Sequence, residues 1–530
     1  MKRSLCGECP AREGGQQEPA RLWWSDLAVR NTYVLIAATV GSGMAFLDAT
    51  AVNVILPIVQ RDLHADVRLV QWVVEGYALF LSALILTGGA LGDVYGRRKI
   101  FIIGILLFGI ASSACAVSQT MTQLVIARCI QGIGAALLVP QSLALITTHF
   151  NDRERPKAIG TWAAFSAITG AIGPVLGGVL AQAISWRLVF VVNVPLALAV
   201  LFISLRYVDE SRDEDAGTHI DFGGATLATI GLGGLVYALI ALQAGTHDVL
   251  MLAAGGASVG VLGLFVWYES RVKKPMLPLK FFASADFSSA NVYTFLLYAG
   301  LGGSLFFVPF DLINVQQYTP TESGAALLPV TLLIFSLSRF SGTLISRIGA
   351  RPMLVAGALF AAGGFALFAL AGEGRSYWLT FFPASIVLGI GAALFVTPLT
   401  ATVMSSLPQQ HAGVASGVNN AVARTAGLVA VAALGLILSM VFYRTYDGQI
   451  ARAHLGSQTR ALLDRERLRL VTGYVPPSIQ RADKARVRTI EDTSFVDAFA
   501  WVMAVSAGLS VAAAGIAKFS FSHKIEANAA

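Results

Sequence analysis

Asp48, Glu75 and Arg128 are ionisable residues that lie within long apolar stretches of the sequence. A charged side chain at the centre of a membrane-spanning helix costs about 2.5 to 3.5 kcal/mol on insertion scales, so it should face the protein interior and find a partner. Burial strengthens the affinity of a carboxyl group for protons and a nearby cation weakens it, so a site that alternates between wet and dry can take up and release protons. We therefore predict that these residues couple proton movement to another process. The alternative for Asp48 is a permanent structural ion pair with Arg128.

Glu75 lies about five residues, or roughly 8 Å at 1.5 Å per residue, from the outer end of its predicted helix. A second acid near Asp48 could neutralise a cationic substrate or share the carriage of protons, because close carboxylates titrate as a pair. The other interpretation is a glutamate at the membrane interface that faces an external vestibule.

The amino-acid composition restricts the class of protein to which these residues belong. The chain has 530 residues, of which 55% are hydrophobic and 13% are charged, and its mean hydropathy is +0.67. Globular proteins have about 25% charged residues, so a disordered scaffold, a disulfide-stapled domain and most cytosolic enzymes are excluded. Cys6 and Cys9 form a single CxxC pair and the seven histidines are scattered, so neither a metal site nor a cofactor is predicted.

The apolar residues occur in about fourteen runs, each close to the roughly 20 residues that a helix needs to cross a hydrocarbon core of about 30 Å. Barrel strands would instead alternate over about ten residues. The predicted fold class is therefore an all-α membrane protein. The predicted spans are 33–58, 70–90, 100–118, 122–147, 157–182, 188–207, 221–243, 249–269, 288–312, 324–346, 353–372, 377–403, 414–442 and 495–518.

The distribution of basic residues predicts that both termini are cytoplasmic. With that orientation the cytoplasmic segments hold 21 Lys and Arg, whereas the external segments shorter than 20 residues hold four. Residues 443–494 contradict this bias, because they carry ten basic residues and are predicted to lie on the external side of the membrane. Within them, Gln458–Leu470 has the pattern of a charged amphipathic helix.

An internal repeat divides the spans into two halves. The sequence Gly132-Ile133-Gly134-Ala135-Ala136-Leu137 recurs at an offset of 257 residues, beginning at Gly389. Two six-helix halves separated by two extra helices would give this spacing, and a site between such halves is typical of alternating-access transport. The predicted parts are a cytoplasmic tail (1–31), an N-terminal six-helix bundle (32–208), two inserted helices (209–270), a C-terminal six-helix bundle with the extracytoplasmic segment 443–494 (271–519) and a second cytoplasmic tail (520–530).

Four motifs carry a resemblance to a known family. They are Leu47-Asp48-x-Thr50-x-Val52-Asn53-Val54-x-Leu56-Pro57, Gly89-x-Leu91-Gly92-Asp93-x-x-Gly96-Arg97-Arg98-Lys99, Arg128-x-x-Gln131-Gly132-x-Gly134 and Gly170-x-x-Gly173-Pro174-x-x-Gly177-Gly178. In these positions they resemble the major facilitator superfamily and, within it, the fourteen-helix drug:proton antiporters. The resemblance implies two pseudo-symmetric six-helix bundles plus two inserted transmembrane helices.

The resemblance also implies roles for three of the motifs. The arginine of the third motif, Arg128, would take part in the proton step. The second motif would form a cytoplasmic gating latch, in which Asp93 can accept hydrogen bonds at a neighbouring helix N-terminus. The fourth would place small residues and a proline kink on one helix face, and it favours exchange over symport. The implied gating residues are Gly89, Asp93, Gly96, Arg97, Arg98, Gly170, Gly173, Pro174, Gly177 and Gly178.

Polar and aromatic residues within the spans are candidates for the substrate pocket, because apolar walls with a few polar groups suit amphipathic molecules and aromatic faces suit cations. Each could instead serve packing or an interhelical hydrogen bond. Asp311 could also be a solvated helix terminus. The candidates are Asn53, Gln71, Trp72, Tyr77, Gln131, Asp311, Asn314, Gln316, Asn419, Asn420 and Arg424.

We predict a bacterial inner-membrane antiporter that expels amphipathic, cationic drugs in exchange for protons and needs no cofactor. The expected partners are a small amphipathic substrate and membrane lipid, without nucleic acid, and a monomer is expected. An exporter of one metabolite, siderophore or self-made antibiotic is the alternative, and a non-transporting receptor is a further one. No constellation of nucleophile and base indicates an enzyme.

Overall fold

The computed structural model describes residues 19–151, 153–212, 220–243, 249–273, 275–374, 376–408, 411–453, 455–465, 479 and 481–521. Within these ranges the chain is helical without strands, and 14 helices are long and apolar enough to cross a membrane. The predicted fold class and number of spans are therefore confirmed. Cys6 and Cys9 lie outside the described residues.

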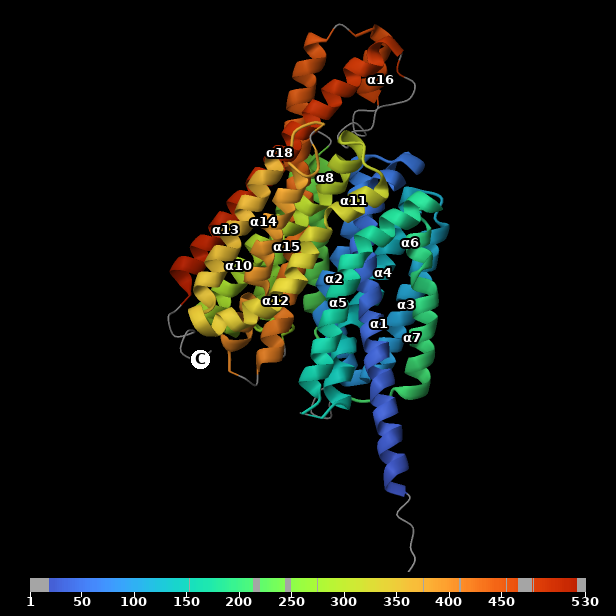
Figure 1. The fold of residues 1–530 in the computed structure, drawn as a ribbon, viewed down its shortest axis with the longest axis vertical. Helices are drawn as coiled ribbons and strands as arrows, with labels where there is room; N and C mark the ends of the chain where they lie inside the picture. The colour runs from blue at the N-terminus through green and yellow to red at the C-terminus, as the bar shows by residue number, and fades with distance from the viewer. Residues whose placement is uncertain are drawn as a thin grey trace, which may run out of the picture.

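The N-terminal half is a bundle in which α1 packs on α5 and α4 packs on both α2 and α3 (Figure 1). Asp66 caps α2 by accepting a hydrogen bond from the backbone of Leu69, and Thr120 opens α4 with a capping box to Gln123. The helices of this half are α1 (Pro19–Asp62), α2 (Val67–Tyr95), α3 (Arg97–Val117), α4 (Met121–His149), α5 (Arg155–Ala183), α6 (Leu188–Val191) and α7 (Asn193–Tyr207).

The C-terminal half repeats this design with one irregular helix. The helix α10 continues without a break into a π-helical turn, η2, which begins at Asp311. The elements of this half are η1 (Leu279–Ala283), α10 (Ala285–Phe310), η2 (Asp311–Val315), α11 (Pro320–Ala326), α12 (Leu328–Ile348), α13 (Ala350–Ala369), α14 (Phe381–Ser405), α15 (Ala412–Arg452), α16 (Ser457–Arg465) and α18 (Arg481–Ser520).

Glycine contacts show that the two halves pack alike. A Cβ on Gly104 of α3 would lie 3.0 Å from the carbonyl oxygen of Gly134 on α4, and a Cβ on Gly357 of α13 would lie 3.0 Å from that of Gly391 on α14. The same close approach of small residues thus recurs at sequence offsets near those of the repeated motifs. Gly96 and Gly349, both at positive φ, make the equivalent sharp turns between α2 and α3 and between α12 and α13.

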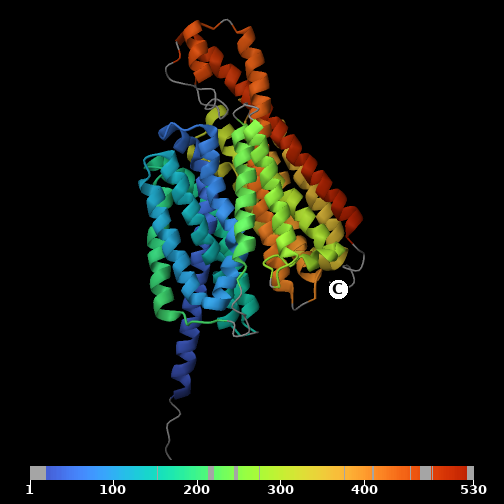
Figure 2. The ribbon, with the colours of Figure 1, turned by 180° about the vertical axis from the view of Figure 1, so that it is seen from behind.

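The inserted helices α8 (Phe222–Leu242) and α9 (Val249–Glu269) pack on each other, and α8 also contacts α2 of one half and α15 of the other. Figure 2 shows this green pair lying along one seam between the halves. The inserted pair therefore covers a boundary that would otherwise face lipid.

The segment between the last two spans projects beyond the bundle as a hairpin, formed by the ends of α15 and α18 with α16 between them (Figure 1). It lies at the end opposite to the start of α1 and the end of α18. Part of the amphipathic helix predicted from Gln458 is α16, which ends at Arg465 in the described chain.

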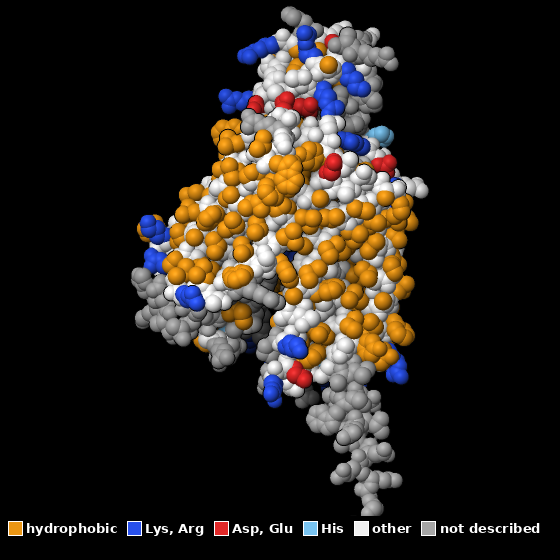
Figure 3. All heavy atoms as spheres, in the orientation of Figure 1, with side chains coloured by type: hydrophobic (Ala, Val, Ile, Leu, Met, Phe, Trp, Pro, Cys, Tyr) orange, Lys and Arg blue, Asp and Glu red, His pale blue; other side chains and the backbone are white. Residues whose placement is uncertain are grey.

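The halves meet at the hairpin end and separate toward the end where α1 begins. Near the hairpin, a Cβ on Gly324 of α11 would meet the backbone of Pro174 on α5. Toward the other end, Phe165 and Ile168 of α5 and Phe335 of α12 are exposed, and a Cβ on Gly160 would have nothing within 4 Å. Figure 3 shows the hollow between the halves on this side. The cleft is thus open toward the termini.

Candidate functional site

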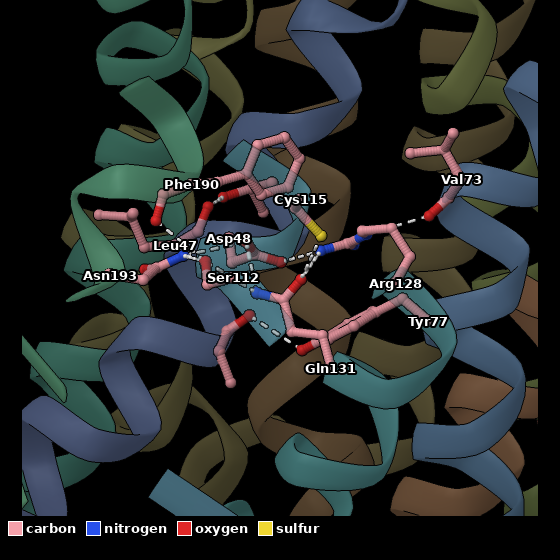
Figure 4. Close-up of polar contacts among 12 residues, drawn as sticks. Leu47, Asp48, Val73, Tyr77, Ser112, Cys115, Arg128, Gln131, Phe190 and Asn193 are labelled. Carbon is pink, nitrogen blue, oxygen red and sulfur yellow. Dashed lines mark hydrogen bonds and ion pairs between the residues drawn. The ribbon is translucent and has the colours of Figure 1, made fainter. Parts of the chain in front are cut away.

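Asp48 lies at the centre of a buried polar network in the N-terminal half (Figure 4). It forms an ion pair with Nη1 of Arg128, which donates to its Oδ2. Its other oxygen, Oδ1, accepts hydrogen bonds of 3.1 Å from the side-chain amides of Gln131 and Asn193. Ser112 accepts from the Asn193 amide at 3.1 Å and donates to a backbone carbonyl. Side chains of α4 and α7 therefore donate to the α1 carboxylate, and Ser112 of α3 supports one of these donors.

The guanidinium of Arg128 is held as tightly as its partner. Its Nε donates to the carbonyl oxygen of Val73 at 3.0 Å, and its Nη1 also donates to Oε1 of Gln131 at 2.8 Å. The ring of Tyr77 lies under it at 4.3 Å from Cζ to the ring centroid, a cation–π contact. Arg128 is 1% exposed and Asp48 is 0% exposed. The predicted pairing of Arg128 is thus with Asp48.

The protonation of Asp48 would change this network chemically. A proton on Oδ2 would cancel the negative charge that faces Arg128 and would turn an acceptor into a donor. The arginine would then be a buried cation without a counter-charge, which is a costly state. A proton can therefore act as a switch on the packing of α1 against α4.

Glu75 is two helical turns into α2, because the helix begins at Val67 instead of near residue 70. It is fully buried, and neither carboxylate oxygen has a hydrogen-bond partner among the described residues. Its neighbours one turn away on either side, Gln71 and Leu79, face α8. Glu75 therefore faces the seam of α2, α8 and α15, and it does not pair with Arg128 in the described structure.

Gln243, the C-cap residue of α8, joins this seam. Its Nε2 donates to Oε1 of Gln71 at 2.8 Å, and both side chains are buried. A Cβ on Gly435 of α15 would lie 2.9 Å from Nε2 of Gln243 and would also meet Gln71. The inserted helix thus contributes a polar contact where both halves meet, one turn from Glu75.

Other candidate substrate residues close the hairpin end of the bundle. Arg61 at the end of α1 donates to the side chain of Asn314, whose backbone carbonyl accepts from Arg488 at 3.2 Å. Gln316 donates to the carbonyl of Gly372 at 2.8 Å and also contacts Asp311 at 3.4 Å. Asp311 is buried in the π-helical turn, so it is not a solvated helix end. Asn314 thereby links the two halves across the closed end.

The remaining candidates are spread over three places. Asn419 donates to Asn291 and Thr294 inside the C-terminal half, whereas Asn420 is exposed and bonds within its own helix. Arg424 reaches across from α15 to the ring of Phe46 on α1. Trp72 packs in the α2–α8–α15 cluster. Asn53 on α1 has a buried amide oxygen without a described partner. The structure does not assemble the candidate set into one pocket.

The second motif forms the turn between α2 and α3 within the N-terminal half. Asp93 pairs with Arg97 on the next helix, at 2.8 Å. The cap of α3 is Glu210, whose carboxylate accepts from the backbone amides of Arg98 at 3.0 Å and Lys99 at 3.1 Å. A Cβ on Gly96 would lie 2.6 Å from that carboxylate. Two acids therefore accept hydrogen bonds at the N-terminus of α3: Asp93, as predicted, from the side chain of Arg97, and Glu210, which was not predicted, from the backbone.

The glycines of the fourth motif let α5 approach two neighbours. A Cβ on Gly177 would lie 2.7 Å from the carbonyl oxygen of Ala51 on α1, and one on Gly173 would meet Thr50. Gly178 faces Pro320 of the other half across the closed end. Gly170 has open space, so it does not share this packing role.

Sequence patterns alone missed several contributors. Asn193 and Ser112 complete the Asp48 network, Gln243 and Arg61 contact other parts of the molecule, and Glu210 caps α3. Each is a polar residue near a helix end or inside an apolar run, which is a weak signal because many such residues bond only locally. Among the described residues no group of three or more His, Cys, Asp and Glu could hold a metal ion.

Two similar helical bundles with a cleft between them that is open at one end are the architecture typical of a membrane transporter. A family model described as Major Facilitator Superfamily matches residues 38–432. The chain belongs to this superfamily.

Relatives and solved structures agree with this assignment. The chain is 36% identical over 421 residues to the multidrug resistance protein Stp of Mycobacterium tuberculosis, covering 79% of this chain and 78% of that one. It is 32% identical over 506 residues to the tetracenomycin C resistance and export protein of Streptomyces glaucescens, covering 93% and 92%. The fold is similar to an inward-facing, unoccupied bacterial homologue of the human lysosomal transporter Spinster, with a TM-score of 0.66, 16% identity and coverage of 93% and 99%.

Proposed function

We propose that the protein exports amphipathic compounds across a bacterial inner membrane in exchange for protons, with both termini in the cytoplasm. The observation that carries the proposal is the buried Asp48–Arg128 pair, which lies in the half-bundle that must move against its partner. The names of the relatives Stp and tetracenomycin C resistance and export protein support drug export. The cleft open toward the termini supports loading from the cytoplasm.

The proposed cycle uses one proton-binding event at the carboxylate of Asp48. When the cleft opens outward, a proton from outside binds Oδ2, the ion pair with Arg128 breaks, and the substrate leaves outward. When the cleft opens inward, the proton is released to the cytoplasm and the pair forms again. The conformation described here, open at the terminal end with the pair formed, corresponds to the step after proton release. Glu75, which has no counter-charge among the described residues, is the second proposed proton carrier.

The membrane potential supplies about 2.3 kcal/mol per charge per 100 mV, in addition to the proton gradient. A preference for cations was predicted from Glu75, which in this conformation faces the α8 seam instead of the cleft. Arg424, a cation, reaches across from α15 to α1. A panel of cationic, neutral and anionic compounds tests the predicted preference for cations.

Export of one self-made antibiotic is the second candidate function. It is favoured by the tetracenomycin C resistance and export protein, which matches 93% of this chain. A carrier of this kind would move one compound class and ignore cationic dyes of similar size. The same panel separates the two candidates.

The test is substrate-driven proton movement in proteoliposomes that contain a pH-sensitive dye and the full-length protein. Adding cationic, neutral and anionic amphipathic compounds in turn should move protons for at least one class, and a proton ionophore should abolish the signal. Asp209→Asn serves as a control, because Asp209 pairs with Arg30 at the surface. A receptor would bind compounds without any proton flux, and binding without flux for every class would overturn the proposal.

A further inference from the structure

A groove between α15 and α18 lies outside the transport pathway, where the bundle passes into the hairpin. Two adjoining cavities of about 740 and 480 Å³ form it, and they share the side chains of Val441, Thr445 and Trp501. Ala500 and Ala504 of α18 form an apolar part of its wall. None of the residues predicted for proton coupling or substrate binding lines it.

The groove crosses the boundary between lipid and water. The outermost large apolar side chains exposed on the described parts of α15 and α18 are Met440 and Trp501, at 55% and 59% exposure. Arg444 lies one turn further out than Met440, and Asp497 lies one turn further out than Trp501. An exposed tryptophan with charged residues one turn away is typical of the headgroup region of a bilayer. Figure 3 shows the same change, from a broad apolar belt to Lys and Arg side chains on the hairpin.

The groove carries both signs of charge at separate places. Arg444 and Arg452 line its outer cavity, both exposed and neither in an ion pair within the described part of the chain. Asp497 lines the adjoining cavity; burial and, to a smaller extent, the charge of Asp497 raise the pKa of the nearby Glu373 carboxyl. Two guanidinium groups suit a phosphate, because arginine presents planar donors to its oxygens. The acid beyond Trp501 suits an ammonium group.

We propose that this groove binds an aminophospholipid of the leaflet on the hairpin side, with its phosphate at Arg444 and Arg452, its amine at Asp497 and an acyl chain along Val441 and Ala504. The combination of charges favours this occupant over a purely anionic lipid. Such a lipid would bring a phosphate near Asp497 without an ammonium group to pair with that acid. The bound lipid fills the gap where α15 and α18 leave the membrane together. It thereby anchors the hairpin to the bilayer surface, independently of the transported compound.

The experiment is native mass spectrometry of the delipidated full-length protein, titrated separately with phosphatidylethanolamine, phosphatidylglycerol and phosphatidylcholine. The wild type should retain phosphatidylethanolamine more tightly than the other two. Arg444→Gln/Arg452→Gln should weaken its binding at least about tenfold, as expected for the loss of charge-assisted hydrogen bonds. Arg486→Gln, an exposed basic residue of the hairpin outside the groove, is the matched control and should change nothing.

A second variant tests the amine. Asp497→Asn should remove the preference for phosphatidylethanolamine over phosphatidylglycerol while leaving phosphatidylglycerol binding intact or stronger. Thermal unfolding of each variant in the absence of lipid shows whether it is folded, so weak binding is not confused with misfolding. Equal binding of all three lipids by the wild type, or binding that is unaffected by the double arginine variant, would overturn the assignment.

Discussion

Replacing Asp48 by asparagine should destabilise the protein far more than an ordinary loss of charge. The side chain is 0% exposed and accepts bonds from Arg128, Gln131 and Asn193. Asparagine keeps the shape but turns one acceptor into a donor, so an amide group would face groups that also donate. Removing one partner of a buried ion pair costs about 3–5 kcal/mol, because the other charge remains buried and uncompensated.

The assay is denaturant unfolding in detergent micelles, read as a double-mutant cycle of Asp48→Asn, Arg128→Gln and both together. We expect each single variant to lose about 3–5 kcal/mol, and the double variant to be about 1–3 kcal/mol more stable than the sum of the two losses predicts. Asp93→Asn is the control, since its pair with Arg97 is partly exposed to solvent at a helix end and contributes about 1 kcal/mol. If Asp48→Asn costs no more than this control, or if the two losses are additive, the pair is not the buried, coupled unit described here.

Three further predictions concern the packing of α15 on α2 and α8, the closed hairpin end and the N-terminal cap of α3. Gly435→Ala should destabilise the protein by about 1–3 kcal/mol and slow transport, because its Cβ would collide with Gln71 and Gln243. Gly427→Ala on the same helix is the control and should be tolerated, because its Cβ would have open space. Unfolding and transport assays of the two variants in parallel make the comparison. Gln182→Cys/Thr321→Cys, joined by a short cleavable thiol cross-linker, should lock the hairpin end closed, since Gln182 Oε1 accepts from the Thr321 backbone at 3.3 Å. Transport should stop until the linker is cleaved, and transport that continues after verified cross-linking would contradict closure at this end. Glu210→Ala should lower stability by about 1 kcal/mol through loss of the α3 cap, measured by the unfolding midpoint, with Asp209→Asn as its neighbouring control.

The spans and the two halves could be predicted from sequence because lipid imposes a simple rule. Every helix that crosses it must be apolar over about the same length, and duplicated packing leaves glycines at repeated spacing. For a similar reason Arg128 could be predicted to pair with an acid, because a charge in lipid needs a partner, but the sequence left both Asp48 and Glu75 open. The open alternative was Glu75, and only the three-dimensional path of α2 shows that it faces α8.

The rest of the site depends on contacts that leave no mark on local sequence. Asn193 reaches Asp48 from 145 residues away, and Gln243 meets Gln71 from 172 residues away. Asp311 could be a pocket residue or a solvated helix end on the sequence alone, and the π-helical turn that buries it could not be predicted from hydropathy. Hydropathy shows that a polar residue lies within a membrane span, but it does not show which neighbouring helix the side chain faces. The candidate substrate residues could therefore be identified, but not which of them lie together.

The most direct measurement of the central claim compares wild type with Asp48→Asn in proteoliposomes, using one compound that the wild type is shown to transport. Proton flux and compound binding are measured on the same preparation, with Asp209→Asn as the folded control. The account predicts that Asp48→Asn still binds the compound but no longer moves protons against it. Proton flux at the wild-type rate in Asp48→Asn would contradict it.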